Sequence, residues 1–217
     1  MNRFSLIFLG IFAIAALSWS SLVFSNQRAY GAITAHYDEN EGKAFPQPIP
    51  GLAQRGKLVY QDLGCAACHT QQVRRPGFGA DQGRGWGERQ SVARDYLYEG
   101  RVLLGAMRLG PDLRNVGARQ ADPVWHLQHL YDPTLVNADS AMPAYRFLFE
   151  TRQIIGQPSA KALTLPASHA PQAGYEVVPT ERAQALAYYL ANLNDAYAYP
   201  ETNNVYVEAA STEGEQK

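Results

Sequence analysis

The sequence lacks an excess of charge of either sign. It has 19 Lys and Arg against 20 Asp and Glu, for a formal net charge of −1, so its composition does not indicate nucleic-acid binding or a strongly basic membrane-binding face. Internal repeats are absent, and no alternating pattern is long enough to predict a sheet. At 217 residues the chain has room for one globular domain with accessory segments, because domains usually comprise ~100–150 residues.

Ionisable side chains are missing from Phe4–Phe24, which reads FSLIFLGIFAIAALSWSSLVF. A helix of this length spans ~30 Å, the thickness of the hydrocarbon core of a bilayer. A cleaved signal peptide is the alternative, but its apolar region usually has only ~7–15 residues and ends at a small-x-small site. The flank SNQRAY offers no clean site of that kind. We therefore expect residues 1–27 to be an uncleaved, single-pass transmembrane anchor in a lipid bilayer.

The residues flanking this segment predict its orientation and a tether. Arg3 precedes the span, while Arg28 is soon followed by three acidic residues, an asymmetry that favours a cytoplasmic N-terminus and an exported domain. Further on, GKAFPQPIPG has a proline at every second position from Pro46 to Pro50. This spacing forbids a helix and favours extended chain, so residues 28–50 are predicted to be an extended linker.

The next part, residues 51–195, is predicted to be an all-α domain. A helix with Leu52, Val59 and Leu63 on one side is expected from about Gly51 to the glycine at 64. Capping and proline signals predict further helices from Ser91 to Tyr98, from Asp122 to before Pro133, and from Thr180, the last with Ala183, Leu186, Ala187, Leu190 and Leu193 inward. Residues 150–179 are expected to be irregular, and 196–217 to be a disordered tail.

Both cysteines of the chain lie in GCAACHTQQ, where Cys65 and Cys68 are followed directly by His69. C-x-x-C-H is the attachment signature of c-type haem. Two thiols bond the vinyl groups of one porphyrin, and the adjacent imidazole binds the iron. A single copy of the motif predicts one covalently attached haem c, with His69 as an axial ligand.

Three other interpretations of the motif fit the sequence less well. A thioredoxin-like redox pair requires a preceding strand in a βαβ unit, whereas this motif follows a predicted helix. A zinc site needs further Cys or His at ligand spacing, and His126 and His129 are distant and alone. A disulfide across two residues would be strained and leaves His69 unexplained.

The second axial ligand is predicted to be Met142, in SAMPAYRFL. Pro143 prevents regular structure after it, so the thioether can lie on a loop over the haem. His and Met ligation leaves no open site on iron and suits electron transfer. Met107 is the rival and is expected to be a core side chain instead, while ligation by His126 or His129 would give a bis-His haem.

The motif GPDL at 110–113 predicts support for the haem. The carbonyl of Pro111 is expected to accept the Nδ1 proton of His69, which orients the ring and raises its basicity. Arg108 is predicted to pair with a haem propionate, an ordinary surface arginine being the alternative.

Several segments resemble the mono-haem subunit (subunit II) of cbb3-type cytochrome c oxidases. They are the N-terminal anchor, GKLVYQDLGCAACHTQQVRRP, SVARDYLYEG, RLGPDLRNVGARQADPVWHLQHLYDPTLVNADSAMPAYRFL and ALAYYLANL, which together extend over most of residues 1–195. The order of GPDL, WHxxHLY and MPAY is more specific than C-x-x-C-H or Met-Pro alone. Two features depart from the family: the stretch GFGADQGRGWGERQ after RRP, and Gly100-Arg101 in place of a His-Pro pair.

The resemblance implies a cytochrome c-like haem domain with haem held by Cys65 and Cys68 and ligated by His69 and Met142. It implies that electrons pass to a haem-copper catalytic subunit, with a di-haem cytochrome c subunit as a second partner. The chain would then be non-catalytic by itself and would lie in the bacterial inner membrane with its haem domain on the periplasmic side. Alternatives are a free-standing membrane-anchored cytochrome c or subunit of another reductase, and a peroxidase-like enzyme with an open haem site.

Overall fold

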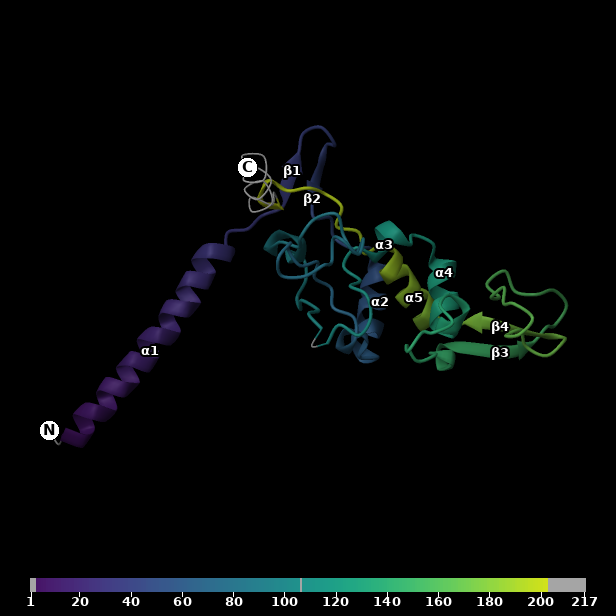
Figure 1. Ribbon diagram of the computed structural model, residues 1–217, viewed down its shortest axis with the longest axis horizontal. Helices are drawn as coiled ribbons and strands as arrows, with labels where there is room; N and C mark the ends of the chain where they lie inside the picture. Colours follow the sequence, from purple (N-terminus) through teal and green to yellow (C-terminus); the bar gives the residue numbers. More distant parts are fainter. Residues whose placement is uncertain (1–2, 106, 203–217) are drawn as a thin grey trace, which may run out of the picture. The chain divides into compact units, whose positions relative to one another are not determined.

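The computed structural model describes residues 3–105 and 107–202, which divide into two compact units. One unit comprises the chain up to Pro46 together with Ala93–Leu97, and the other comprises Gln47–Val92 and the chain from Tyr98 onward. The hydrophobic core lies in the second unit. Figure 1 draws the helices and strands of both.

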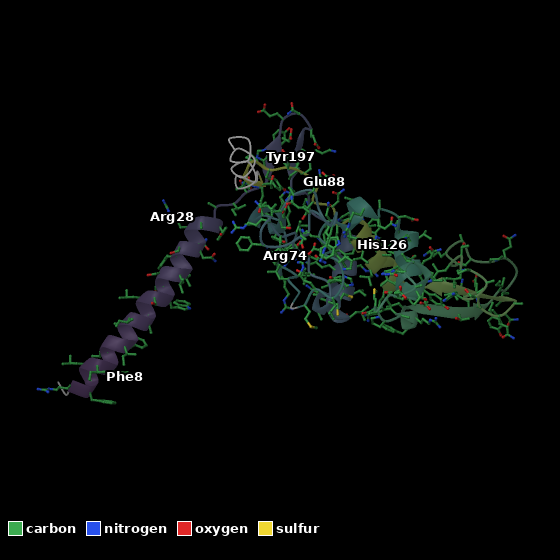
Figure 2. The ribbon with its side chains drawn as sticks, viewed as in Figure 1. Phe8, Arg28, Arg74, Glu88, His126 and Tyr197 are labelled. Atoms are coloured by element: carbon green, nitrogen blue, oxygen red, sulfur yellow. The ribbon has the colours of Figure 1, made fainter. Side chains whose placement is uncertain are left out.

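The first unit begins with the long helix α1 (Arg3–Tyr30), which has no buried residue. Its 28 residues include a window of mean hydropathy 2.2, so it is long and apolar enough to cross a membrane. Figure 2 shows side chains on all sides of α1, with Phe8 and Arg28 labelled near its two ends. This helix is the segment in which the sequence predicted a membrane span.

A short hairpin follows α1 inside the stretch predicted to be an extended linker. Strand β1 (His36–Asp38) pairs antiparallel with β2 (Lys43–Phe45). The turn between them forms because Asp38 Oδ1 accepts the backbone N–H groups of Asn40 and Glu41, and Gly42 supplies a positive φ of 63°.

The core of the second unit is built on helices α2 (Gly51–Asp62), α4 (Pro123–Tyr131) and α5 (Glu181–Ala191), which lie together in Figure 1. α2 crosses α5 closely because Gly56 lacks a side chain: a Cβ there would lie 2.0 Å from the carbonyl oxygen of Ala185. Beside this crossing, the rings of Tyr60 and Tyr189 pack edge to face with centroids 5.8 Å apart.

The predicted helix ends agree with the structure at α4 and α5. Asp122 caps α4 by accepting the N–H of Val124 at 2.9 Å, with Pro123 in the first turn. Thr180 caps α5 by accepting the N–H of Ala183 at 3.3 Å. The residues predicted to face inward on α5 and just after it are buried: Ala183, Leu186, Ala187, Leu190 and Leu193.

The prediction for α2 was wrong in one respect. Val59 is buried as expected, but Leu52 is 42% exposed. Ala53, Gly56 and Tyr60 face the core instead. The close approach of α5 leaves no room for a side chain at Gly56, and Tyr60 packs beside that contact on Tyr189.

Other segments are shorter or more regular than predicted. The helix expected at Ser91–Tyr98 is a 3₁₀ turn at Ala93–Tyr96. The irregular stretch expected at 150–179 contains an antiparallel pair, β3 (Phe149–Gln153) and β4 (Tyr175–Pro179). Of the predicted tail, residues 196–202 include a 3₁₀ turn at Pro200–Thr202 after a buried Tyr199, while 203–217 lie outside the described residues. The remaining short helical elements are α3 (Val116–Arg119) and 3₁₀ turns at Cys65–Ala67, Pro133–Leu135 and Arg146–Leu148.

Candidate haem-binding site

The C-x-x-C-H motif lies immediately after α2, on a tight turn. Gly64 ends the helix with φ of 69°, a left-handed conformation that favours glycine. The chain then forms a 3₁₀ turn at Cys65–Ala67, closed by a 3.0 Å hydrogen bond from the N–H of His69 to the carbonyl of Cys65. This turn brings Cys65, Cys68 and His69 to the wall of one cavity.

Three hydrogen bonds hold the imidazole of His69 and the backbone next to it. Its Nδ1 lies 2.8 Å from the carbonyl oxygen of Pro111, the acceptor expected from the GPDL motif. The hydroxyl of Tyr60 donates to the carbonyl of His69 at 2.8 Å, and the N–H of Gly110 donates to the carbonyl of Cys68 at 3.1 Å. With Nδ1 as donor, the proton is absent from Nε2, whose lone pair is then available to a metal ion.

Gly110 lies directly against the imidazole ring. A Cβ at this position would be 2.1 Å from Cε1 of His69 and 2.6 Å from its Nδ1. The ring therefore occupies the space that any other residue at 110 would need.

The cavity has a volume of ≈ 850 Å³, near the upper end of the ~300–1,000 Å³ typical of cofactor sites. Its walls come from α2, α4, α5 and the segments between them. The lining includes the apolar or aromatic residues Tyr60, Leu113, Val116, Trp125, Leu130, Tyr145, Leu186 and Leu190.

The two candidate methionine ligands are placed differently. Met142 lines the cavity and packs against the hydrophobic core. Its backbone N–H donates to Ser140 Oγ at 3.3 Å, which shapes the loop before Pro143. Met107 is 51% exposed and is not among the residues that line this cavity, and it is not the core side chain that the sequence predicted.

The two histidines of α4 also line the cavity. His126 is buried, and its Nε2 lies 2.8 Å from the carbonyl oxygen of Gln120. His129 stacks on Trp125, with ring centroids 5.1 Å apart. Burial lowers the pKa of His129 to about 4, with the charges of His126 and His69 adding to the effect, so the ring is neutral at physiological pH.

Arg108 does not line the cavity. Its Nη2 lies 2.6 Å from Oδ2 of the buried Asp81, and its Nη1 donates to the carbonyl of Gln72 at 3.2 Å. The arginines that do line the cavity are Arg84 and Arg119, which the sequence analysis did not single out.

The family described as cytochrome c oxidase, mono-heme subunit/FixO has a sequence profile that matches residues 32–208. The chain belongs to the FixO family. It is therefore a mono-haem electron-transport subunit of a cytochrome c oxidase and works beside the catalytic subunit of that enzyme. The resemblance that the sequence motifs indicated is confirmed. No curated protein matches the chain.

The residues around the cavity fit the haem that a FixO subunit carries. Two thiols, an imidazole and a thioether line one largely apolar space. Nδ1 of His129 is buried without a hydrogen-bond partner among the described residues, and a bound group with polar edges would satisfy it. Gly110 leaves room for the imidazole ring. The residues present around the cavity therefore fit one haem.

The alternatives to haem fit the FixO chain less well. Burial raises the pKa of the Cys65 thiol to about 11, whereas redox-active cysteines have a lowered pKa. The motif also follows a helix and not a strand. Within residues 3–105 and 107–202, no three His, Cys, Asp or Glu side chains group as a metal site, which disfavours zinc.

The loop between the motif and Ser91 is held together by a buried carboxylate. Asp81 is fully buried at its centre and accepts the backbone N–H of Arg74 at 2.8 Å. Burial alone would raise the pKa of Asp81, but hydrogen bonds from Arg74 and the charge of Arg108 hold that pKa below its ordinary value. The guanidinium of Arg84 lies over Trp86, 4.9 Å from the ring centroid, and both residues face the cavity. The only signal in the sequence for these two cavity-lining residues is an Arg and a Trp close together in a glycine-rich stretch.

Proposed function

We propose that this chain passes electrons through one covalently bound haem c to the oxygen-reducing subunit of a cbb3-type oxidase. One observation supports this most: Cys65, Cys68, His69 and Met142 line one cavity, and Pro111 accepts a hydrogen bond from His69. The haem, when bound, supplies reversible one-electron chemistry at its iron.

Each of these side chains has a separate task in the proposal. Cys65 and Cys68 bind the porphyrin through thioether bonds, which reduction cannot break. His69 would hold the iron through Nε2 and Met142 through its thioether, a ligand pair that would leave no position on the iron for a substrate. Thioether ligation also keeps the reduction potential high.

The rest of the chain positions this haem. Residues 51–195 form the haem domain with a cytochrome c-like fold, and residues 1–27 anchor it in the bacterial inner membrane with the domain on the periplasmic side. Arg84 and Arg119 line the cavity and are the cations proposed for the haem propionates in place of Arg108, with Nη2 of Arg119 also donating to the carbonyl of Asp112 at 2.6 Å. A di-haem cytochrome c subunit is the proposed second partner.

Affinity purification from membranes in mild detergent tests the proposal. The expected result is that the tagged chain retains a haem-copper subunit and a di-haem cytochrome, and that its own haem is low-spin and unreactive with cyanide. Recovery of the chain without a haem-copper subunit would instead support a free-standing cytochrome. High-spin ferric iron that binds cyanide with Met142 intact would support an enzyme with an open site.

A further inference from the structure

The side chain of Asp112 connects the two segments that carry His69 and Pro111. It is fully buried. Its Oδ2 accepts the backbone N–H of Gln72, and its Oδ1 accepts that of Arg114, both at 2.8 Å. One donor follows His69 in the sequence and the other follows Pro111, so the carboxylate joins the imidazole segment to its acceptor segment.

Backbone hydrogen bonds join the same two segments on either side of Pro111. The N–H of Gly110 donates to Cys68 at 3.1 Å, and the N–H of Leu113 donates to Thr70 at 3.0 Å. Asp112 adds a third connection between them. The carbonyl of Pro111 is therefore fixed opposite Nδ1 of His69 by contacts that precede and follow it.

The negative charge of Asp112 is balanced from the side of the loop. Arg108 places Nη1 3.5 Å from Oδ2 of Asp112 and Nη2 2.6 Å from Oδ2 of Asp81. Asp81 in turn lies 2.9 Å from Nη2 of Arg74. Two carboxylates with fully buried side chains and two arginines thus alternate, which is the arrangement that buried charges require. Asp81 belongs to GFGADQGRGWGERQ, the stretch in which this sequence departs from the family.

We propose that Asp112 is a positioning residue for His69: it fixes the Pro111 carbonyl that accepts the Nδ1 proton and thereby sets the donor strength of the imidazole toward iron. This inference rests on the proposed function, in which His69 binds the iron. A firm hydrogen bond at Nδ1 makes the imidazole a stronger donor and favours ferric iron. Loosening that bond, or removing the nearby negative charge, favours ferrous iron.

Two substitutions separate position from charge. Asp112→Asn keeps the shape but has only one oxygen to accept two N–H groups, and it removes the charge. Asp112→Glu keeps the charge but moves the carboxylate by one methylene. Asp139→Asn is the control, because Asp139 is also an acidic residue at the cavity, but its backbone N–H donates to Asn137 and it lies outside the segments that carry His69 and Pro111.

The readouts are the reduction potential of the intact haem and the iron–histidine stretching frequency. The frequency is measured by resonance Raman spectroscopy in the ferrous Met142→Ala background, where iron has one protein ligand. Both Asp112 variants are expected to lower the stretching frequency. Asp112→Asn is also expected to shift the electron-exchange equilibrium about tenfold toward ferrous haem, ~59 mV for one electron. Asp139→Asn is expected to leave the frequency unchanged.

Wild-type frequencies in the Asp112 variants, or a frequency shift of equal size in Asp139→Asn, would overturn the positioning role. If Asp112→Asn does not fold, Asp112→Glu alone decides. A wild-type chain that holds no haem, or a Met142→Ala variant with the wild-type spectrum, would instead refute the proposed function and is recognised before either Asp112 variant is measured.

Discussion

Gly110→Ala adds one methyl group next to the proximal imidazole, and its effect can be worked out from the structure. The new Cβ would lie 2.1 Å from Cε1 and 2.8 Å from Nε2 of His69. Real Cβ contacts are not this short, so something must move. The ring cannot simply rotate away, because Nδ1 is bound to Pro111 and, in the proposed function, Nε2 is bound to iron. The backbone of Gly110 is held by its own bond to Cys68.

The expected cost is that of overpacking, ~1–3 kcal/mol. For a domain of this size, ~2–4 °C of melting temperature is lost per kcal/mol, so a decrease of about 2–12 °C is predicted. Because the clash is with the proposed iron ligand, the low-spin spectrum is expected to weaken as well. Thermal unfolding followed in the haem absorption bands measures both effects on one sample.

Gly100→Ala is the matched control. A Cβ at Gly100 has no atom within 4 Å, and its φ is not in the left-handed range. Alanine there is expected to be neutral or to stabilise the protein by ~0.4–1 kcal/mol, by restricting the unfolded chain. If Gly110→Ala melts like Gly100→Ala and keeps the wild-type spectrum, the close packing of position 110 on His69 is refuted.

Three further predictions concern other parts of the second unit. Met142→Ala should lower the reduction potential and let cyanide bind, whereas Met107→Ala should leave the visible spectrum unchanged; spectroelectrochemistry checks both, and the reverse pattern would exchange their roles. A hydrogen bond from the Thr134 hydroxyl, with help from a nearby arginine, lowers the pKa of Asp132 to about 2. Because this pKa is below its ordinary value, the stabilisation from the ionised carboxylate is complete above about pH 4 and is lost as the pH falls toward 2. Urea unfolding should therefore show that Asp132→Asn loses less free energy of unfolding over that pH range than wild type does. Gly56→Ala should separate α2 from α5, because its Cβ would lie 2.0 Å from a carbonyl oxygen, and an unchanged denaturation midpoint would contradict that close crossing.

Local signals predicted those parts of the fold that depend on near neighbours. Asp122 and Thr180 cap their helices as expected because a cap needs only residues two or three positions away. The spacing of Cys65, Cys68 and His69 predicts a haem motif because it involves only five consecutive residues, and covalent attachment there stays a prediction.

Other features depend on distant partners and could not be predicted from sequence. Strand β4 is buried along most of its length, so it has no alternating pattern, and its pairing with β3 depends on contacts such as Arg152 to Glu176 at 2.9 Å. Arg108 was expected at a propionate, but its charge is used by Asp81, 27 positions away. The sequence alone cannot reveal whether Arg108 pairs with a haem propionate or with the carboxylate of Asp81.

The most direct test of the account is whether haem stays attached to the purified, denatured chain. We predict that denaturing electrophoresis shows haem on this polypeptide, that the pyridine haemochrome spectrum is that of two thioether bonds with one haem per chain, and that Cys65 and Cys68 resist alkylation. A colourless polypeptide, or two thiols that react fully after denaturation, would contradict it.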